Sequence, residues 1–154
     1  MKTIVVLGDK ELSQKLNAIN QDITNEGLRT GLKAGGLLMT GYVKRNIVEQ
    51  KLVDTGNLLN SIGLKDVALY DGGGYVNVGT NVVYARIHEF GGVIKPVRAK
   101  MLSWIDKETG KRIFAHKAVI PARPYMRPAI ESHKDDVAKT VIYYLKKAVM
   151  GHAD

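Results

Sequence analysis

The chain has 154 residues, with 23 Lys and Arg against 15 Asp and Glu, which gives a formal net charge of +8. That length predicts one domain, and the hydrophobic content of 45% indicates a globular protein with an ordinary core rather than a disordered chain. The absence of cysteine excludes disulfides, thiol catalysis and zinc–thiolate sites. The apolar stretch Ile4–Leu7 is too short for a signal-peptide core or a membrane span, so composition favours a soluble intracellular protein.

The N-terminal third is predicted to be helical after a short β-prone run at Thr3–Leu7, with Asp9 as N-cap. Two apolar stripes with helical spacing follow: Leu12, Leu16, Ile19 and Ile23, then Leu28, Leu32, Met39, Val43 and Ile47. Gly27, Gly31 and Gly35 interrupt them at four-residue intervals. Each Gly costs a helix interior about 1 kcal/mol relative to Ala. Either the helix breaks near Asn25–Gly27, which we favour, or these glycines form a flat face for close backbone approach.

The middle of the chain is predicted to contain two hairpins after a turn at residues 54–57. In the first, Gly63–Tyr70 and Tyr75–Val78 flank a glycine-rich tip. In the second, Lys100–Ile105 and Arg112–Ile120 are joined through residues 106–111, although these strands do not alternate cleanly between apolar and polar residues.

The C-terminal part is predicted to be an extended segment followed by a long helix. Pro121, Pro124 and Pro128 enforce the extended segment, and Pro128 can occupy the first helical turn. The helix carries an apolar stripe formed by Ile130, Val137, Val141, Tyr144, Leu145 and Ala148. The predicted fold is therefore α+β, with an antiparallel β-sheet packed against N-terminal helices and a long C-terminal helix. We expect a single domain over residues 1–154, with a helical part at 9–50, a β-rich middle at 54–120 and the last helix at 127–150.

The positive charge is local. The span Arg86–Arg127 contains ten basic and three acidic residues, a net charge of +7, whereas the remaining residues carry +1. Such a field favours a polyanion, an acidic protein surface or a charged ring, and the alternative is a solvated hairpin that happens to be basic. The candidate residues for facing a partner or DNA are Arg98, Lys100, Lys107, Lys111, Arg112, Lys117 and Arg123. No recognised nucleic-acid module accompanies them, so sequence-specific DNA reading is not expected.

No residue pattern predicts catalysis, a cofactor site or a metal site. His88-Glu89 lacks the second histidine of a zinc-protease motif, because that position is Gly92. No serine has a nucleophile-elbow context, and the glycines at 72–74 lack the following residues of a phosphate-binding loop. We therefore expect a protein that is not an enzyme and has no cofactor. The alternative is a metal-dependent enzyme that uses His88, Glu89 and His116.

Three phrases in chain order are similar to those of a known family. They are Thr55–Ile62 (TGNLLNSI), Val78–Gly92 (VGTNVVYARIHEFGG) and Ile120–Ala129 (IPARPYMRPA). Together, and closed by a C-terminal helix, they resemble the virion-morphogenesis and tail-completion proteins of tailed bacteriophages, including minor tail and head–tail joining proteins.

The resemblance implies a structural protein of the phage neck that completes the tail and joins it to the head connector. It implies a homo-oligomeric ring around the DNA passage, which we expect to be a hexamer, with no membrane part. The implied partners are the tail terminator or tail tube and the head–tail connector. Packaged DNA is a further, nonspecific contact. The implied location is the virion, after assembly in the bacterial host cytoplasm.

The residues of the three phrases have an architectural interpretation. Gly56, Gly79 and the Gly91-Gly92 pair are expected at sharp chain reversals, and Tyr84, Ile87 and Phe90 are expected to pack a short helix against the sheet. Two alternatives to the tail-completion role stay open. One is a tail terminator or minor tail protein at another neck position, and the other is a nonspecific nucleic-acid-binding protein that uses residues 86–127.

Overall fold

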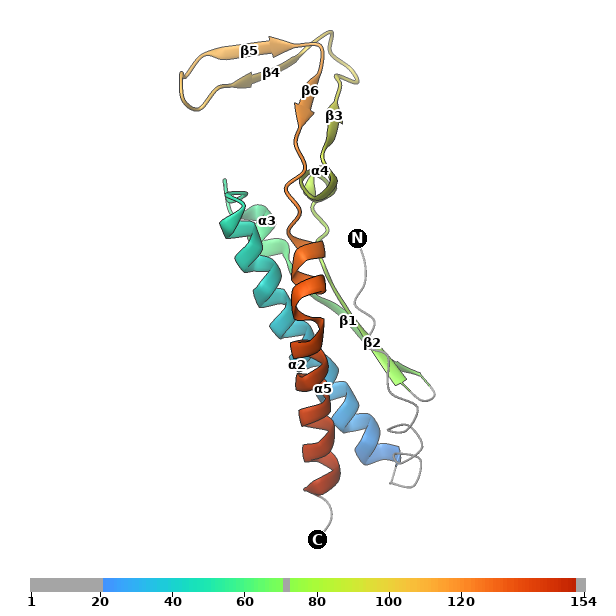
Figure 1. Ribbon diagram of the computed structural model, residues 1–154. Helices are drawn as coiled ribbons and strands as arrows, with labels where there is room; N and C mark the ends of the chain where they lie inside the picture. Colours follow the sequence, from blue (N-terminus) through green and yellow to red (C-terminus); the bar gives the residue numbers. More distant parts are fainter. Residues whose placement is uncertain (1–20, 71–72, 152–154) are drawn as a thin grey trace. The chain divides into compact units, whose positions relative to one another are not determined.

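The structure is a computed structural model that describes residues 21–70 and 73–151, and its secondary structure is of the α+β class, as predicted (Figure 1). In chain order the elements are α2 (Gln21–Glu49), α3 (Asn57–Ser61), β1 (Gly63–Tyr70), β2 (Gly73–Gly79), α4 (Ala85–Phe90), β3 (Gly92–Ile94), β4 (Leu102–Ile105), β5 (Arg112–Ala115), β6 (Ala118–Ile120) and α5 (Met126–Met150). The predicted strand at Thr3–Leu7, the cap at Asp9 and the first apolar stripe as far as Ile19 lie outside the described residues. None of the described helices is long and apolar enough to cross a membrane.

The chain divides into two compact units. One, which we call the helical unit, comprises residues 1–82 and 125–154, and the other, the hairpin unit, comprises residues 83–124. The described strands form three separate two-stranded antiparallel sheets, β1–β2, β3–β6 and β4–β5, where the sequence suggested one sheet. The β1–β2 sheet belongs to the helical unit and the other two belong to the hairpin unit.

Helix α2 runs without interruption through its glycines, so the predicted break near Asn25–Gly27 is wrong. The glycines instead form the flat face of the second interpretation, and that face lies against α5. A Cβ built on Gly27 would lie 2.6 Å from Ala148 Cβ. One built on Gly31 would lie 2.8 Å from the Val141 carbonyl oxygen, and one on Gly35 would lie 3.0 Å from Val137 Cγ1. The two helices are therefore antiparallel and too close for larger residues at these positions.

The β1–β2 hairpin covers another side of α2. A Cβ on Gly36 would lie 2.6 Å from Val76 Cγ2. Leu32, Val76 and Val141, one residue from each of α2, β2 and α5, form the centre of the core. Leu28, Leu64, Val67 and Leu69 pack around it. The predicted hairpin is confirmed, with a register shift between Leu64 and Asp66.

Two predicted details of the helical unit have different outcomes. Gly56 adopts a left-handed conformation with φ of 81° directly before α3, as expected for a chain reversal. Gly79 is instead the last residue of β2, where it pairs with Gly63 and has no positive φ, so the reversal expected there is wrong. Pro128 lies in the first turn of α5, where its missing N–H costs no hydrogen bond.

We predict that Gly31→Ala destabilises the helical unit, because the added methyl group must push α5 away. Overpacking typically costs about 1–3 kcal/mol, which exceeds the gain of about 1 kcal/mol in helix propensity. Gly41→Ala is the matched control, since a Cβ there meets nothing within 4 Å, and it should raise the free energy of unfolding by up to about 1 kcal/mol. Urea denaturation of both variants measures the difference. A Gly31→Ala protein as stable as Gly41→Ala would contradict the close helix contact.

Candidate functional site

The β4–β5 hairpin has a turn fixed by its own side chains. The Asp106 carboxylate oxygen Oδ1 accepts hydrogen bonds from the Thr109 N–H at 2.7 Å and from the Thr109 hydroxyl at 2.8 Å. These bonds hold the pKa of Asp106 below its ordinary value. Gly110, with φ of 67°, closes the turn by donating its N–H to the Asp106 carbonyl at 2.8 Å. The strands are therefore held in one register by local contacts.

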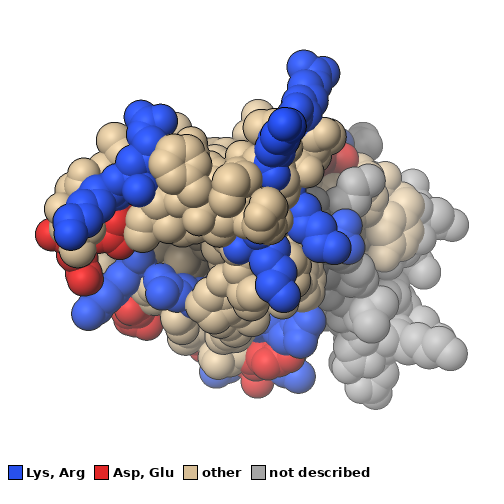
Figure 2. Space-filling model, turned by 90° about the horizontal axis from the view of Figure 1, so that it is seen from above, with Lys and Arg blue, Asp and Glu red and all other residues tan. Residues whose placement is uncertain are grey.

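All seven candidate partner-facing cations lie in the hairpin unit, and all seven are exposed. Arg112 is the first residue of β5, whereas Lys107 and Lys111 lie in the preceding turn. The hairpin unit contains nine basic and three acidic residues, a net charge of +6. On the face shown in Figure 2, Lys and Arg side chains are more abundant than acidic side chains. The structure thus gathers these cations on one compact part of the chain.

The second predicted hairpin is confirmed for β4 and β5, but the strand expected at Arg112–Ile120 is divided in two. Its second part, β6, pairs with β3, so that Gly92 lies opposite Ile120 and Ile94 lies opposite Ala118. The sequence pattern predicts no strand at 92–94, so β3 is an addition to the expected elements. Gly91, with φ of 70°, makes the chain reversal expected there, and a Cβ on it would lie 2.8 Å from the Ala122 nitrogen.

Helix α4 buries other residues than the sequence suggested. Of the three residues expected to pack the helix against a sheet, Tyr84 and Phe90 are 44% and 50% exposed, contrary to that expectation, whereas Ile87 is half-buried. Ala85 and Glu89 are the buried positions, because they lie four residues apart on one helix face. The Arg123 N–H donates to the His88 carbonyl at 2.7 Å, which ties the proline-containing segment to α4. Burial lowers the pKa of His88 below its ordinary value, and the Arg123 charge lowers it further.

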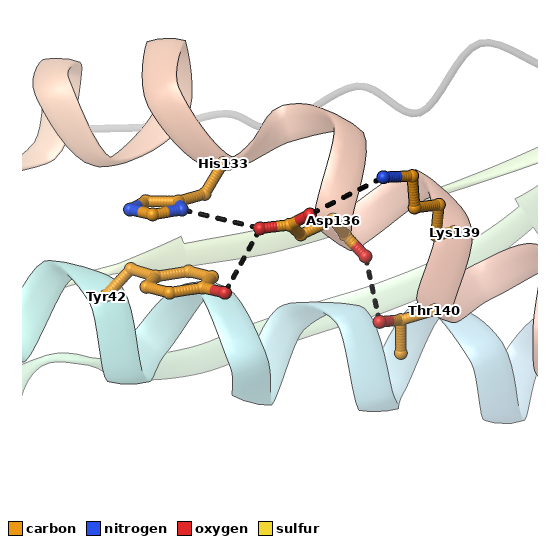
Figure 3. Close-up of polar contacts among 5 residues, drawn as sticks. All are labelled: Tyr42, His133, Asp136, Lys139 and Thr140. Atoms are coloured by element: carbon orange, nitrogen blue, oxygen red, sulfur yellow. Dashed lines mark hydrogen bonds and ion pairs between the residues drawn. The ribbon is translucent and has the colours of Figure 1, made fainter.

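A polar cluster joins the two long helices of the helical unit (Figure 3). The Tyr42 ring of α2 stacks on the His133 imidazole of α5, with 3.6 Å between ring centroids. The Tyr42 hydroxyl donates to Asp136 Oδ2 at 3.3 Å, and His133 Nδ1 lies 3.6 Å from the same oxygen. Lys139 Nζ lies 3.9 Å from Asp136 Oδ1. These contacts fix the register of α2 against α5.

The described residues assemble no metal site. No group of three or more His, Asp or Glu side chains in that part of the chain could hold a metal ion, and this includes His88, Glu89 and His116. Sequence reasoning missed a different set, the exposed apolar side chains of the hairpin strands: Trp104, Ile105, Ile113 and Phe114. The sequence feature that indicates them is that apolar and polar residues do not alternate cleanly along these strands.

Comparison with protein families matches residues 10–91, more than half of the chain, to the family HK97-gp10_like, described as "Bacteriophage HK97-gp10, putative tail-component". The chain belongs to this family of phage tail components. A tail component is part of the virion, so the resemblance to phage tail proteins is confirmed at this level. The match contains α2 to α4 and ends before the β4–β5 hairpin and α5. Searches of curated proteins and of solved structures gave no match.

His88 is predicted to lower the stability of this tail component in acid. Its pKa is lower in the folded than in the unfolded chain, so the unfolded chain binds the proton first as the pH falls below about 6.5. Above that pH neither state is protonated and the residue has no effect. His88→Gln should therefore give a shallower loss of the free energy of unfolding between about pH 7.5 and 5 in urea titrations.

Arg123→Gln is the graded control for this prediction. Like His88→Gln, it should make the loss of the free energy of unfolding with falling pH shallower, but by a smaller amount. The reason is that burial, which this variant leaves in place, is the larger cause of the lowered pKa of His88. Equal slopes for the wild type and His88→Gln would mean that His88 has the same pKa in both states, contrary to its burial.

Proposed function

We propose that this tail component completes the phage tail and joins it to the head connector, without catalysing a reaction. The observation that carries the proposal is the family match together with the third phrase, Ile120–Ala129, and the helix that follows it. The match supports a tail role, and the third phrase is the part of the resemblance to tail-completion and head–tail joining proteins that lies beyond the matched residues.

The proposed assembly is a homo-oligomeric ring, a hexamer, that surrounds the DNA passage of the neck. Its neighbours are the tail terminator or tail tube on one side and the connector on the other. It has no cofactor and no membrane part. The exposed cations of the hairpin unit support this arrangement, since a lumen that carries DNA and an acidic neighbouring protein both favour positive charge.

Deleting the gene is expected to leave DNA-filled heads and complete tails that are not joined. Purified protein added to a mixture of these heads and tails should restore plaque-forming particles, and electron microscopy should place it at the neck. Native mass spectrometry should give a hexamer for the protein on tails or in solution. Joined, infectious particles in the absence of the protein would contradict the proposal. Unjoined tails of irregular length would instead assign it the role of a terminator, because a terminator stops tail growth.

A second candidate function, nonspecific nucleic-acid binding, is favoured by the seven exposed cations. It predicts that the affinity for duplex DNA falls steeply with salt, with a log–log slope of about −0.9 for each neutralised phosphate. The variant Lys100→Gln/Lys111→Gln/Lys117→Gln should lower that slope by up to about 3 units. Lys33→Gln/Lys134→Gln/Lys146→Gln, which removes three exposed lysines of the helical unit, is the matched control and should leave it unchanged. Equal slopes for the two triple variants in fluorescence anisotropy would reject this function for the hairpin unit.

A further inference from the structure

The β4–β5 hairpin presents apolar side chains on both of its faces. Paired residues of an antiparallel sheet project to the same side, and successive pairs alternate between sides. One side, which we call the Trp104 face, carries Leu102, Trp104, Ile113 and Ala115. The other, the Phe114 face, carries Ser103, Ile105, Arg112 and Phe114.

Within the hairpin unit, neither face is fully covered by the other described residues. On the Trp104 face, Trp104 and Ile113 are 41% and 37% exposed, and on the Phe114 face Ile105 and Phe114 are 61% and 59% exposed. Hairpins with one buried face show apolar residues on that face only, whereas strands buried on both sides are apolar on both. An isolated two-stranded hairpin is at best marginally stable in water. The apolar residues on both faces are therefore typical of a hairpin buried on both sides, whereas the described residues of the hairpin unit leave both faces partly exposed.

The net charge of the hairpin unit indicates which kind of molecule can cover the β4–β5 hairpin. The hairpin unit has a net charge of +6, the whole chain has +8, and the residues outside the hairpin unit still carry +2. A second copy of the chain, even as a neighbour in the proposed ring, would add positive charge and so would not neutralise Lys100, Lys111 and Lys117, which flank the two strands. An occupant with acidic side chains around an apolar surface would neutralise them.

DNA fits the cations but not the two apolar faces. A two-stranded ribbon can enter the major groove, where polar side chains on its inner face contact the base edges. Of the four residues on the Trp104 face, three have purely hydrocarbon side chains, and Trp104 offers a single donor. On the Phe114 face, only Ser103 and Arg112 carry polar side chains. Burying Ile105 and Phe114 against phosphates would gain no hydrogen bond and would desolvate the charges.

We propose that the β4–β5 hairpin inserts into a cleft of another protein of the phage particle, one with apolar walls and an acidic rim. Trp104 and Ile113 contact one wall, and Ile105 and Phe114 contact the other. Lys100, Lys111 and Lys117 pair with the rim. Central aromatic and aliphatic anchors within a charged rim are the usual anatomy of a specific protein interface. The proposal rests on the structural role proposed above, since it supplies the contact by which such a component is held.

Photo-crosslinking in assembled particles tests insertion directly. Phage are grown with the photoreactive residue p-benzoylphenylalanine in place of Trp104 or, separately, of Phe114, and crosslinked peptides are identified by mass spectrometry. Both positions are expected to crosslink to one other virion protein, at peptides flanked by Asp and Glu. The same replacement at Leu37, which is 63% exposed on α2, is the control and should not give those peptides. Crosslinks to this chain itself, to DNA, or from one of the two faces alone would overturn insertion.

A binding measurement separates this proposal from the proposed function. Heads and tails purified from the gene deletion serve as probes, and protein bound to either is measured by co-sedimentation. Trp104→Ser and Phe114→Ser should each weaken binding at least about tenfold, whereas Val97→Ser, at a 96% exposed position of the same unit, should not. Circular dichroism melts check that the variants fold.

The outcomes of this measurement are distinct. Wild-type protein that binds neither heads nor tails would reject both the joining role and the docked hairpin. Wild-type protein that joins heads to tails while Trp104→Ser and Phe114→Ser bind as tightly as it does would reject hairpin insertion alone.

Discussion

The close approach of α5 to the glycine face of α2 is the contact on which the helical unit depends. Three glycines at four-residue spacing remove the side chains that would hold the helices apart, as in the small-residue interfaces of tightly packed helix pairs. Each costs about 1 kcal/mol in helix propensity, so α2 is a poor helix by itself. Dispersion contacts with the α5 backbone and with Val137 and Val141 offset that cost only when α5 is present.

The same helix also sets the position of the β1–β2 hairpin, because Gly36 receives Val76 where a larger residue would not fit. Leu32, one turn earlier, completes the core between the sheet and α5. The interhelical contacts of Tyr42 with His133 and Asp136, and of Asn46 Nδ2 with the Tyr125 carbonyl at 2.9 Å, extend the same antiparallel register toward the start of α5. Glycines on two sides of α2 thus determine how it meets α5 and the first hairpin.

Sequence reasoning predicted the elements whose signals are local and missed those that depend on distant partners. The β1–β2 hairpin, the β4–β5 hairpin and α5 each have a turn or a periodic stripe of their own. The glycines of α2 were ambiguous, because propensity favours a break and only the contact with α5 makes the continuous helix stable. The β3–β6 pairing joins segments more than twenty residues apart, and three-residue strands carry no readable pattern.

The candidate site divides in the same way. Charge is additive along the chain, so sequence alone located the basic span, whereas exposure is a property of the fold and had to come from the structure. The missing alternation in β4 and β5 is not typical of a hairpin that is buried on one face only. The strand register shows that this irregularity places apolar residues on both faces of the hairpin, and burying both faces requires two covering surfaces.

The family match ends at Gly91, before these strands. The helical unit has a core of its own, whereas Ala85 and Glu89 are the only buried residues between 83 and 124. The hairpin unit is therefore the part of the described chain whose stability would rise most when a partner binds it.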